Sequence, residues 1–151
     1  MLLKRYTFWL AAAVLFMFLT AGLHSISFFV SPDIQNETQR QLHDLLHTYR
    51  EDMGGGFHRT FFDLFTALSA CYPLLCVLGG ATLGFMMLKH AEPRYMRGLI
   101  AINLAVFGVC LVVMIVFAFL PPIIVTGLIA FNLLMALAFC PKTKEAATEL
   151  H

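Results

Sequence analysis

Four long apolar runs dominate the pattern of the chain. A longer polar segment separates the first two runs, a short polar join separates the second and third, and the third and fourth adjoin at two prolines. The runs cover about residues 6–30, 60–88, 99–120 and 121–140. Each is long enough for a helix to cross the hydrocarbon of a bilayer, which needs about 20 residues. Unpaired backbone groups are too costly in lipid, and the runs lack the two-residue alternation of barrel strands. The pattern therefore predicts an all-α, integral membrane four-helix transmembrane bundle.

The composition supports a membrane protein. Hydrophobic residues occupy 60% of the 151 positions and charged residues only 13%, with a mean hydropathy of +0.80. A soluble globular domain carries about 25% charged residues. The length predicts a single membrane domain over residues 1–151. Ten Lys and Arg stand against nine Asp and Glu without a basic block, which argues against nucleic acid as a partner. Membrane lipids, a membrane protein partner or a second copy of the chain are the expected partners.

Several residues inside the runs indicate how the helices pack. The Pro-Pro pair at 121–122 predicts a tight hairpin between the third and fourth runs, because proline fits the opening turn of a helix. Gly80 and Gly84 form a small-xxx-small pattern that permits close backbone approach. Asn103 and Asn132 are expected to form hydrogen bonds between helices.

The distribution of Lys and Arg predicts the orientation in the membrane. One side carries Lys4, Arg5, Lys89, Arg94, Arg97, Lys142 and Lys144. The other side carries Arg40, Arg50 and Arg59, all in the longer polar segment. The positive-inside rule places both termini in the cytoplasm and residues 31–59 outside. The first run follows basic residues as a signal peptide would, but it is expected to be retained as a span.

The outer segment, residues 31–59, predicts one amphipathic helix. Its apolar stripe has the spacing i, i+3, i+4, i+7 and consists of Leu42, Leu45, Leu46 and Tyr49. Start signals at 31–33 and three glycines at 54–56 predict a helix over about 33–53. Its polar face is more acidic than basic, so we expect a lid that packs over the bundle rather than a helix attracted to anionic lipid.

The most informative polar residues are His24, His58, Arg59 and Asp63. Asp63 is the only Asp, Glu, Lys or Arg within the four runs, and an ionisable residue inside a span is a functional-site hypothesis by default. Because consecutive antiparallel spans are usually neighbours, His24 and Asp63 are expected to face each other. Arg59 and Asp63 are spaced i, i+4 and can pair along a helix. These four residues are the candidate ligand site.

Structural alternatives exist for Asp63 and His24. Thr60-x-x-Asp63 matches a capping box, in which both side chains satisfy backbone groups of the first turn. The alternative for His24 is a neutral imidazole hydrogen-bonded inside the bundle, as opposed to contact with a ligand, haem or a metal. His43 and His47 could join a metal site, but two histidines are a weak signal, so no metal and no cofactor is assigned. All four cysteines are interpreted as packing residues: Cys71, Cys76, Cys110 and Cys140.

Three stretches carry a resemblance to a known group of proteins: Gly22-Leu23-His24, Met53-Gly54 and His58-Arg59-Thr60-Phe61-Phe62-Asp63-Leu64-Phe65. With the final Pro-containing hairpin, they make the chain similar to a family of small four-span bacterial membrane proteins, broadly DoxX-like in outline, from about residue 6 to 140. Where that family often has Trp before the Asp and Gly shortly after it, this chain has Phe62 and Ala67. The resemblance implies a four-helix fold and a bacterial inner-membrane location, but no activity.

Two functional hypotheses follow. The favoured one is a non-catalytic accessory or scaffold subunit of a membrane assembly, because the runs hold one charge and no complete catalytic constellation. The alternative is an enzyme or binding protein for a lipid, quinone or other hydrophobic ligand in an outer-leaflet pocket. In that alternative His24 accepts a proton or ligates, Asp63 orients it, and Arg59 holds an anionic group. A transporter is least favoured, since a lone shallow Asp gives no path across the bilayer.

Overall fold

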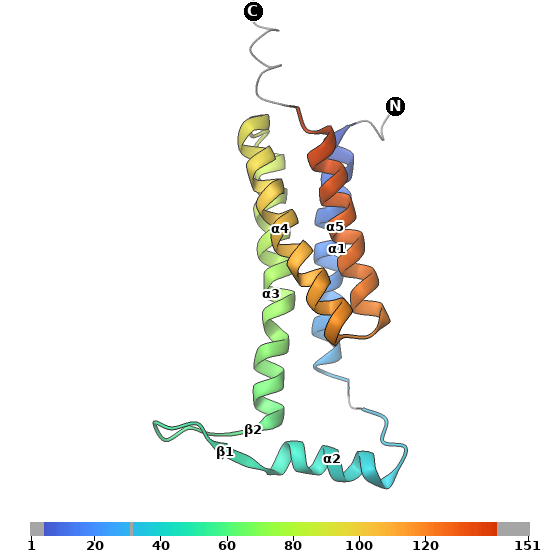
Figure 1. The fold of residues 1–151 in the computed structure, drawn as a ribbon. Coiled ribbons are helices and arrows are strands. Elements are labelled where there is room, and N and C mark those ends of the chain that lie inside the picture. The colour runs from blue at the N-terminus through green and yellow to red at the C-terminus, as the bar shows by residue number, and fades with distance from the viewer. Residues whose placement is uncertain (1–4, 31, 142–151) are drawn as a thin grey trace, which may run out of the picture. The chain divides into compact units, whose positions relative to one another are not determined.

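Four long helices form most of the chain in the computed structural model, which describes residues 5–30 and 32–141. They are α1 (Tyr6–Ser27), α3 (Phe61–Leu88), α4 (Pro93–Phe117) and α5 (Leu120–Phe139) (Figure 1). All four are long and apolar enough to cross a membrane. The prediction of an all-α fold with four such helices is confirmed, and the chain is compatible with a multi-pass membrane protein. Ser31, Lys4, Lys142 and Lys144, which the sequence predictions used, lie outside the described residues.

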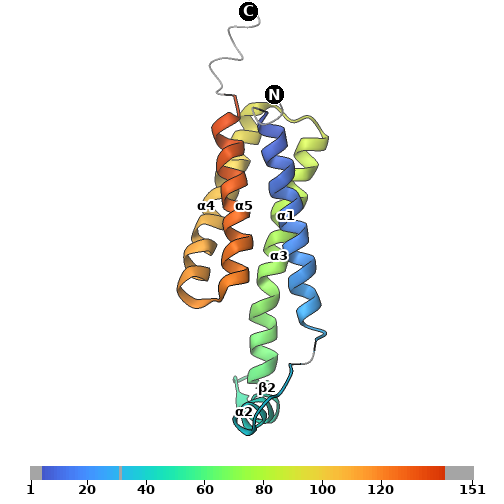
Figure 2. The ribbon, with the colours of Figure 1, turned by 90° about the vertical axis from the view of Figure 1, so that its right-hand side faces the viewer.

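The helix ends differ from the predicted runs by three residues or more at three places, one of them the end of α4 at Phe117 rather than near residue 120. α1 ends at Ser27 rather than near residue 30. α4 begins at Pro93 rather than near residue 99, because proline fits a first turn, where its missing N–H needs no partner. The hairpin at 121–122 is confirmed: α4 ends at Phe117, and α5 begins at Leu120 with the prolines in its first turn (Figure 2).

The chain divides into two compact units. One comprises the described residues up to Thr20 and from Cys76 onward, and the other comprises Ala21–Leu75. The predicted single membrane domain over residues 1–151 stays a prediction.

In the first unit, α4 and α5 pack side by side and antiparallel (Figures 1 and 2). The largest side chains with no appreciable exposure are those of Phe107, Leu10, Met17, Leu83, Met96 and Ile100. Arg97 Nη1 donates hydrogen bonds to the carbonyl oxygens of Leu137, at 3.0 Å, and Cys140, at 2.9 Å. A cation that satisfies the last carbonyls of a helix stabilises its end, so Arg97 fixes the end of α5 against α4.

Glycines of α3 lie in close contact with its neighbours in this unit. A Cβ added at Gly79 would lie 2.8 Å from Asn103 Oδ1, and one added at Gly80 would lie 3.2 Å from the Phe18 ring. At Gly84 the nearest atom would lie at an ordinary 3.6 Å. The close approach predicted for this stretch is thus confirmed at Gly80, and it is tightest at the neighbouring Gly79.

The two buried asparagines bond within their own helices. Asn103 Nδ2 donates to the Leu99 carbonyl at 2.9 Å, and Asn132 Nδ2 donates to the Leu128 carbonyl at 2.7 Å. The prediction that these amides would bond between helices is wrong for their Nδ2 groups. A short polar side chain can reach the carbonyl four residues back on its own helix, which satisfies the donor without a second element.

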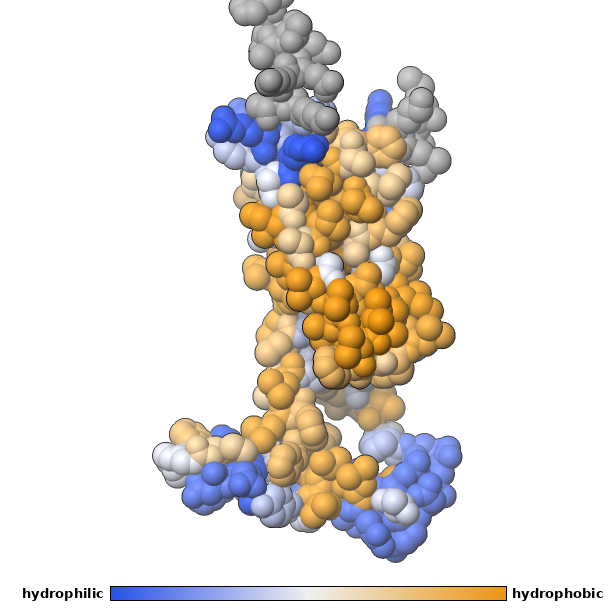
Figure 3. Space-filling view, in the orientation of Figure 1, coloured by the Kyte–Doolittle hydropathy of each residue, from blue (hydrophilic) through white to orange (hydrophobic). Residues whose placement is uncertain are grey.

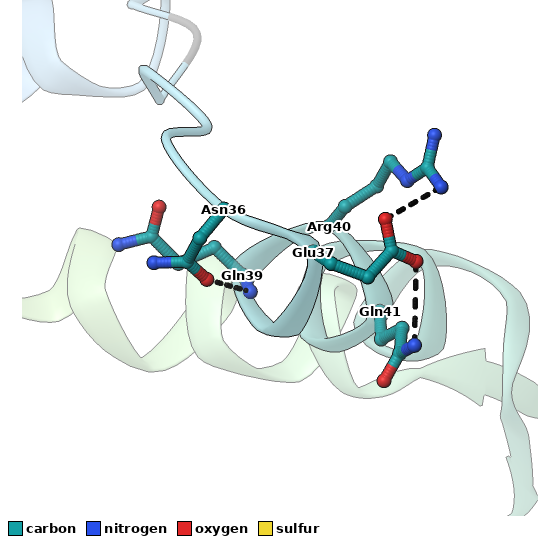
Figure 4. A network of polar contacts seen from close by, with 5 residues as sticks. All are labelled: Asn36, Glu37, Gln39, Arg40 and Gln41. Atoms are coloured by element: carbon teal, nitrogen blue, oxygen red, sulfur yellow. Dashed lines mark hydrogen bonds and ion pairs between the residues drawn. The ribbon is translucent and has the colours of Figure 1, made fainter.

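The second unit contains α2 (Glu37–Thr48), which is shorter at both ends than the predicted 33–53. Asn36 has an extended backbone and is the N-cap of the helix. Its Oδ1 accepts a hydrogen bond from Gln39 N at 2.9 Å (Figure 4). Glu37 follows in the first turn and pairs with Arg40 at 2.6 Å. Asn is among the best N-cap residues, and acidic residues in a first turn complement the helix dipole. The start signal is therefore Asn36, not residues 31–33.

A β-hairpin replaces the predicted end of this helix. β1 (Arg50–Asp52) pairs antiparallel with β2 (His58–Thr60). Gly54, Gly55 and Gly56 all have positive φ, at 78°, 60° and 82°. Only glycine adopts such angles at little cost, so these residues form the turn of the hairpin rather than stop a helix at residue 53.

Most of the surface of the long helices is apolar. Between 11% and 28% of the most apolar window of each helix is buried inside the protein. Figure 3 shows apolar residues across the helices, and polar residues gathered at the start of α2 and on the hairpin. Exposed apolar surface of this extent needs lipid or a partner to cover it, which agrees with a membrane location.

Candidate functional site

A groove of about 870 Å³ opens in the unit Ala21–Leu75. The residues after α1, one face of α2 and the first turns of α3 line it. Its large apolar side chains include Phe28, Leu42, Leu46, Phe62 and Phe65, and its polar ones are Ser27, Asp33, Gln39, His43, His47, Thr66 and Ser69. Ligand sites are typically concave, mostly apolar and 300–1,000 Å³ in volume, with a few polar groups. The groove has that character.

Stacked rings hold α2 against α3. The His47 ring stacks on Phe62 with centroids 4.1 Å apart, and the His43 ring lies 4.1 Å from that of His47. Tyr49 stacks on Phe61 at 5.8 Å. These rings fix the spacing of α2 and α3, which form two walls of the groove.

The histidines of α2 thus have a packing role. His47 Nδ1 lies 2.8 Å from the His43 carbonyl, and since a carbonyl only accepts, Nδ1 is the donor. Within residues 5–30 and 32–141, no group of three or more His, Cys, Asp or Glu side chains is arranged to hold a metal ion.

His24 lies beside the groove wall and is half-buried. Its Nε2 is 2.9 Å from the Ser69 hydroxyl, and its ring meets those of Phe28 and Tyr72 edge-on at 5.5 and 5.6 Å. Ser69 and Phe28 both line the groove. Either tautomer can make the bond to Ser69, because a hydroxyl both donates and accepts. His24 is therefore coupled to the groove through Ser69.

Asp63 forms the capping box that its spacing allows. Its Oδ2 accepts from the Thr60 backbone N–H at 3.1 Å, and Thr60 Oγ1 accepts from the Asp63 N–H at 3.1 Å. No ion pair joins Asp63 to Arg59 in the part of the chain that the structure describes. The Arg59 guanidinium lies 5.9 Å from the centroid of the Phe57 ring, and β-pairing sets Arg59 opposite Glu51.

The four predicted site residues therefore divide among different environments. His24 bonds to Ser69, which is more than one turn beyond Asp63, about 9 Å along α3. His58 is on β2, paired with Asp52. None of the four is among the described residues that line the groove.

Sequence reasoning missed most of the groove. The apolar stripe of α2 gave Leu42 and Leu46, and the aromatic start of the second run held Phe62 and Phe65. The sequence did not show that these two segments lie against each other, because that contact depends on the hairpin formed by the loop between them.

Comparisons with known proteins do not place the chain. No family model, no curated protein and no solved structure matches it.

Proposed function

We propose that this membrane protein binds a hydrophobic or amphiphilic ligand, of the lipid or quinone class, in the groove beside α2. The groove itself carries the proposal, because it combines a suitable volume with aromatic and aliphatic walls. Most of its polar groups are on α2 and α3, Ser27 and Asp33 add two more, and these groups can orient the polar part of such a ligand.

Each nearby polar residue has a separate part in this proposal. Ser69, held by His24, offers a hydroxyl at the wall of the groove. Thr66 and Gln39 add a further hydroxyl and an amide. Asp63 acts indirectly, by fixing the start of α3 through its bonds with Thr60. The role that we propose for this arrangement is to bind and orient a ligand.

A pair of matched variants on α2 tests the proposal. Leu42 and Leu45 are 56% and 58% exposed, but only Leu42 lines the groove. Leu42→Glu places a charge in the apolar wall, whereas Leu45→Glu places the same charge beside it. Native mass spectrometry after gentle extraction would detect a retained lipid, quinone or haem in each variant.

We expect the wild type and Leu45→Glu to retain a ligand and Leu42→Glu to lose it. Equal retention by all three proteins would refute binding in this groove. Far-UV circular dichroism and gel filtration check that both variants fold.

An accessory or scaffold subunit of a membrane assembly is the second candidate. It is favoured by exposed apolar side chains on the hairpin, outside the four long helices: Met53 is 46% exposed and Phe57 is 59% exposed. This candidate would be supported if the same extraction retained a stoichiometric protein partner, or a second copy of the chain, and if Phe57→Asp released that partner. Absence of any such partner together with a retained ligand would favour the groove.

The location that we propose is the bacterial inner membrane, with both termini in the cytoplasm. The DoxX-like resemblance supports the bacterial membrane. The basic residues around Arg5, Lys89, Arg94 and Arg97 support the orientation.

A further inference from the structure

A second groove lies in the other unit, between the end of α3 and the start of α4, and has a volume of about 550 Å³. Phe85 from α3 and Arg94, Tyr95, Gly98 and Ile102 from α4 are among its lining residues. No residue is shared with the groove beside α2. Whatever it binds is thus independent of the function proposed above.

The body of this groove is apolar and open. Phe85 is 59% exposed and Ile102 is 63% exposed. A Cβ added at Gly98 would meet nothing within 4 Å, so the missing side chain leaves space in the groove. A flexible hydrocarbon chain suits such a surface in a helix that crosses lipid.

One end of the groove is cationic. Arg94 lines it, and Lys89 Nζ lies 5.8 Å from the centroid of the Phe85 ring. Unlike Arg97, which is bonded to the end of α5, the Arg94 side chain has no hydrogen bond or ion pair among the described residues. Glu92 is the one acidic residue in this turn. Positive charge therefore prevails where the apolar surface ends.

We propose that this groove binds one anionic phospholipid, with an acyl chain along Phe85 and Ile102 and the phosphate at Arg94 and Lys89. Basic pockets between membrane helices bind anionic headgroups, and guanidinium groups bind phosphate strongly. A free phosphate would use Arg94 but would leave the apolar body without a role. The apolar body and the cationic end together favour an amphiphilic ligand over a free anion.

Binding of defined probes to the purified full chain in detergent tests this proposal. The probes are dioleoyl phosphatidylglycerol, dioleoyl phosphatidylcholine with the same chains, and inorganic phosphate. Native mass spectrometry gives the number of bound lipids, and titration gives the affinity. Arg94→Gln removes the charge, and Gly98→Leu fills the groove.

Two control variants match these changes. Gly108 is also on α4, and a Cβ there would also meet nothing within 4 Å, so Gly108→Leu adds the same bulk elsewhere. Arg5→Gln removes one positive charge from the same predicted side of the membrane. Leu42→Glu keeps this test separate from the groove beside α2.

We expect one phosphatidylglycerol to bind, with phosphatidylcholine about tenfold weaker, because its headgroup has the same phosphate but adds a choline cation that the positive charges of Arg94 and Lys89 repel. Arg94→Gln should weaken phosphatidylglycerol binding by a similar factor. Gly98→Leu should abolish it, and the three other variants should bind as the wild type does.

Equal binding of the two lipids, or unchanged binding by Arg94→Gln, would overturn the proposal. Saturable binding of inorganic phosphate that depends on Arg94, without lipid binding, would show a free anion to be the ligand and would also overturn it. Loss of phosphatidylglycerol binding in Leu42→Glu would assign the lipid to the other groove. If Gly98→Leu fails to fold, the Arg94→Gln comparison still decides.

Discussion

Thr60 and Asp63 each bind the other's backbone. Thr60 Oγ1 accepts from the Asp63 N–H, and Asp63 Oδ2 accepts from the Thr60 N–H, both at 3.1 Å. Thr60 is the last residue of β2, and α3 begins at the next position. The pair therefore joins hairpin to helix and satisfies two backbone donors that would otherwise lack partners. The carboxylate within the second predicted span is thus explained by helix capping.

Loss of this cap should destabilise the protein. Thr60 is 6% exposed, and Thr60→Val keeps its shape while removing the hydroxyl acceptor. We expect the free energy of unfolding to fall by about 1 kcal/mol. Denaturant titration in detergent measures it. Thr60→Ser should retain most of the stability, and a Thr60→Val protein as stable as the wild type would contradict the capping role.

The bond between His24 and Ser69 should appear as an energetic coupling. A double-mutant cycle with His24→Leu and Ser69→Ala should give a coupling of about 1 kcal/mol, as for a partly buried hydrogen bond. Cys71 is on the same helix, and among the described residues its thiol bonds to the Ala67 carbonyl of that helix. A cycle of His24→Leu with Cys71→Ala should therefore show no coupling. Equal values in the two cycles would argue against the bond.

Gly79 should not tolerate a methyl group. The added Cβ of Gly79→Ala would lie 2.8 Å from Asn103 Oδ1 and 3.3 Å from the Phe107 ring, which is itself fully buried. We expect a loss of roughly 1–3 kcal/mol in the free energy of unfolding, as for an overpacked core. Gly108→Ala, which meets open space, should be neutral or stabilising. Thermal unfolding of both variants in one detergent gives the comparison.

Tyr49 should ionise at a higher pH than an ordinary tyrosine. Its hydroxyl donates to Glu51 Oε2 at 2.9 Å, and this bond, followed by the negative charge of the carboxylate, raises the pKa of Tyr49 above 10.0. Because the pKa of Tyr49 is raised in the folded state, its bond to Glu51 contributes fully to the free energy of unfolding at any pH below the pKa of Tyr49 in the unfolded chain. The contribution is lost as pH rises through the folded pKa.

The phenolate absorbance of the wild type minus that of Tyr49→Phe isolates this titration. Glu51→Gln should move the midpoint to lower pH. An unchanged midpoint would show that Glu51 has no influence on Tyr49.

The proposed orientation predicts which positions an impermeant thiol reagent reaches on intact cells. Single cysteines at Gln39, in α2, and at Glu92, between α3 and α4, would be compared in a background without the native cysteines. We expect labelling at the first position and protection at the second, with both labelled after the cells are opened. The reverse pattern would place residues 31–59 in the cytoplasm.

The sequence by itself determined the features that depend on neighbours along the chain. Four apolar runs predicted the four long helices, because backbone groups in lipid must be paired within the helix. The prolines at 121–122 predicted the hairpin, and Thr60-x-x-Asp63 predicted the capping box. In each case the partners lie within one or two turns, so spacing alone specifies the contact.

Only the tertiary structure decided the features that join distant segments. His24 bonds to Ser69, 45 residues away, and no spacing rule selects that partner. The helix predicted to Met53 ends at Thr48, because residues 50–52 gain ladder partners at 58–60. That pairing brings α2 against the aromatic start of α3 and forms the groove. Such contacts compete with local propensity, and the three-dimensional packing of the side chains sets the outcome.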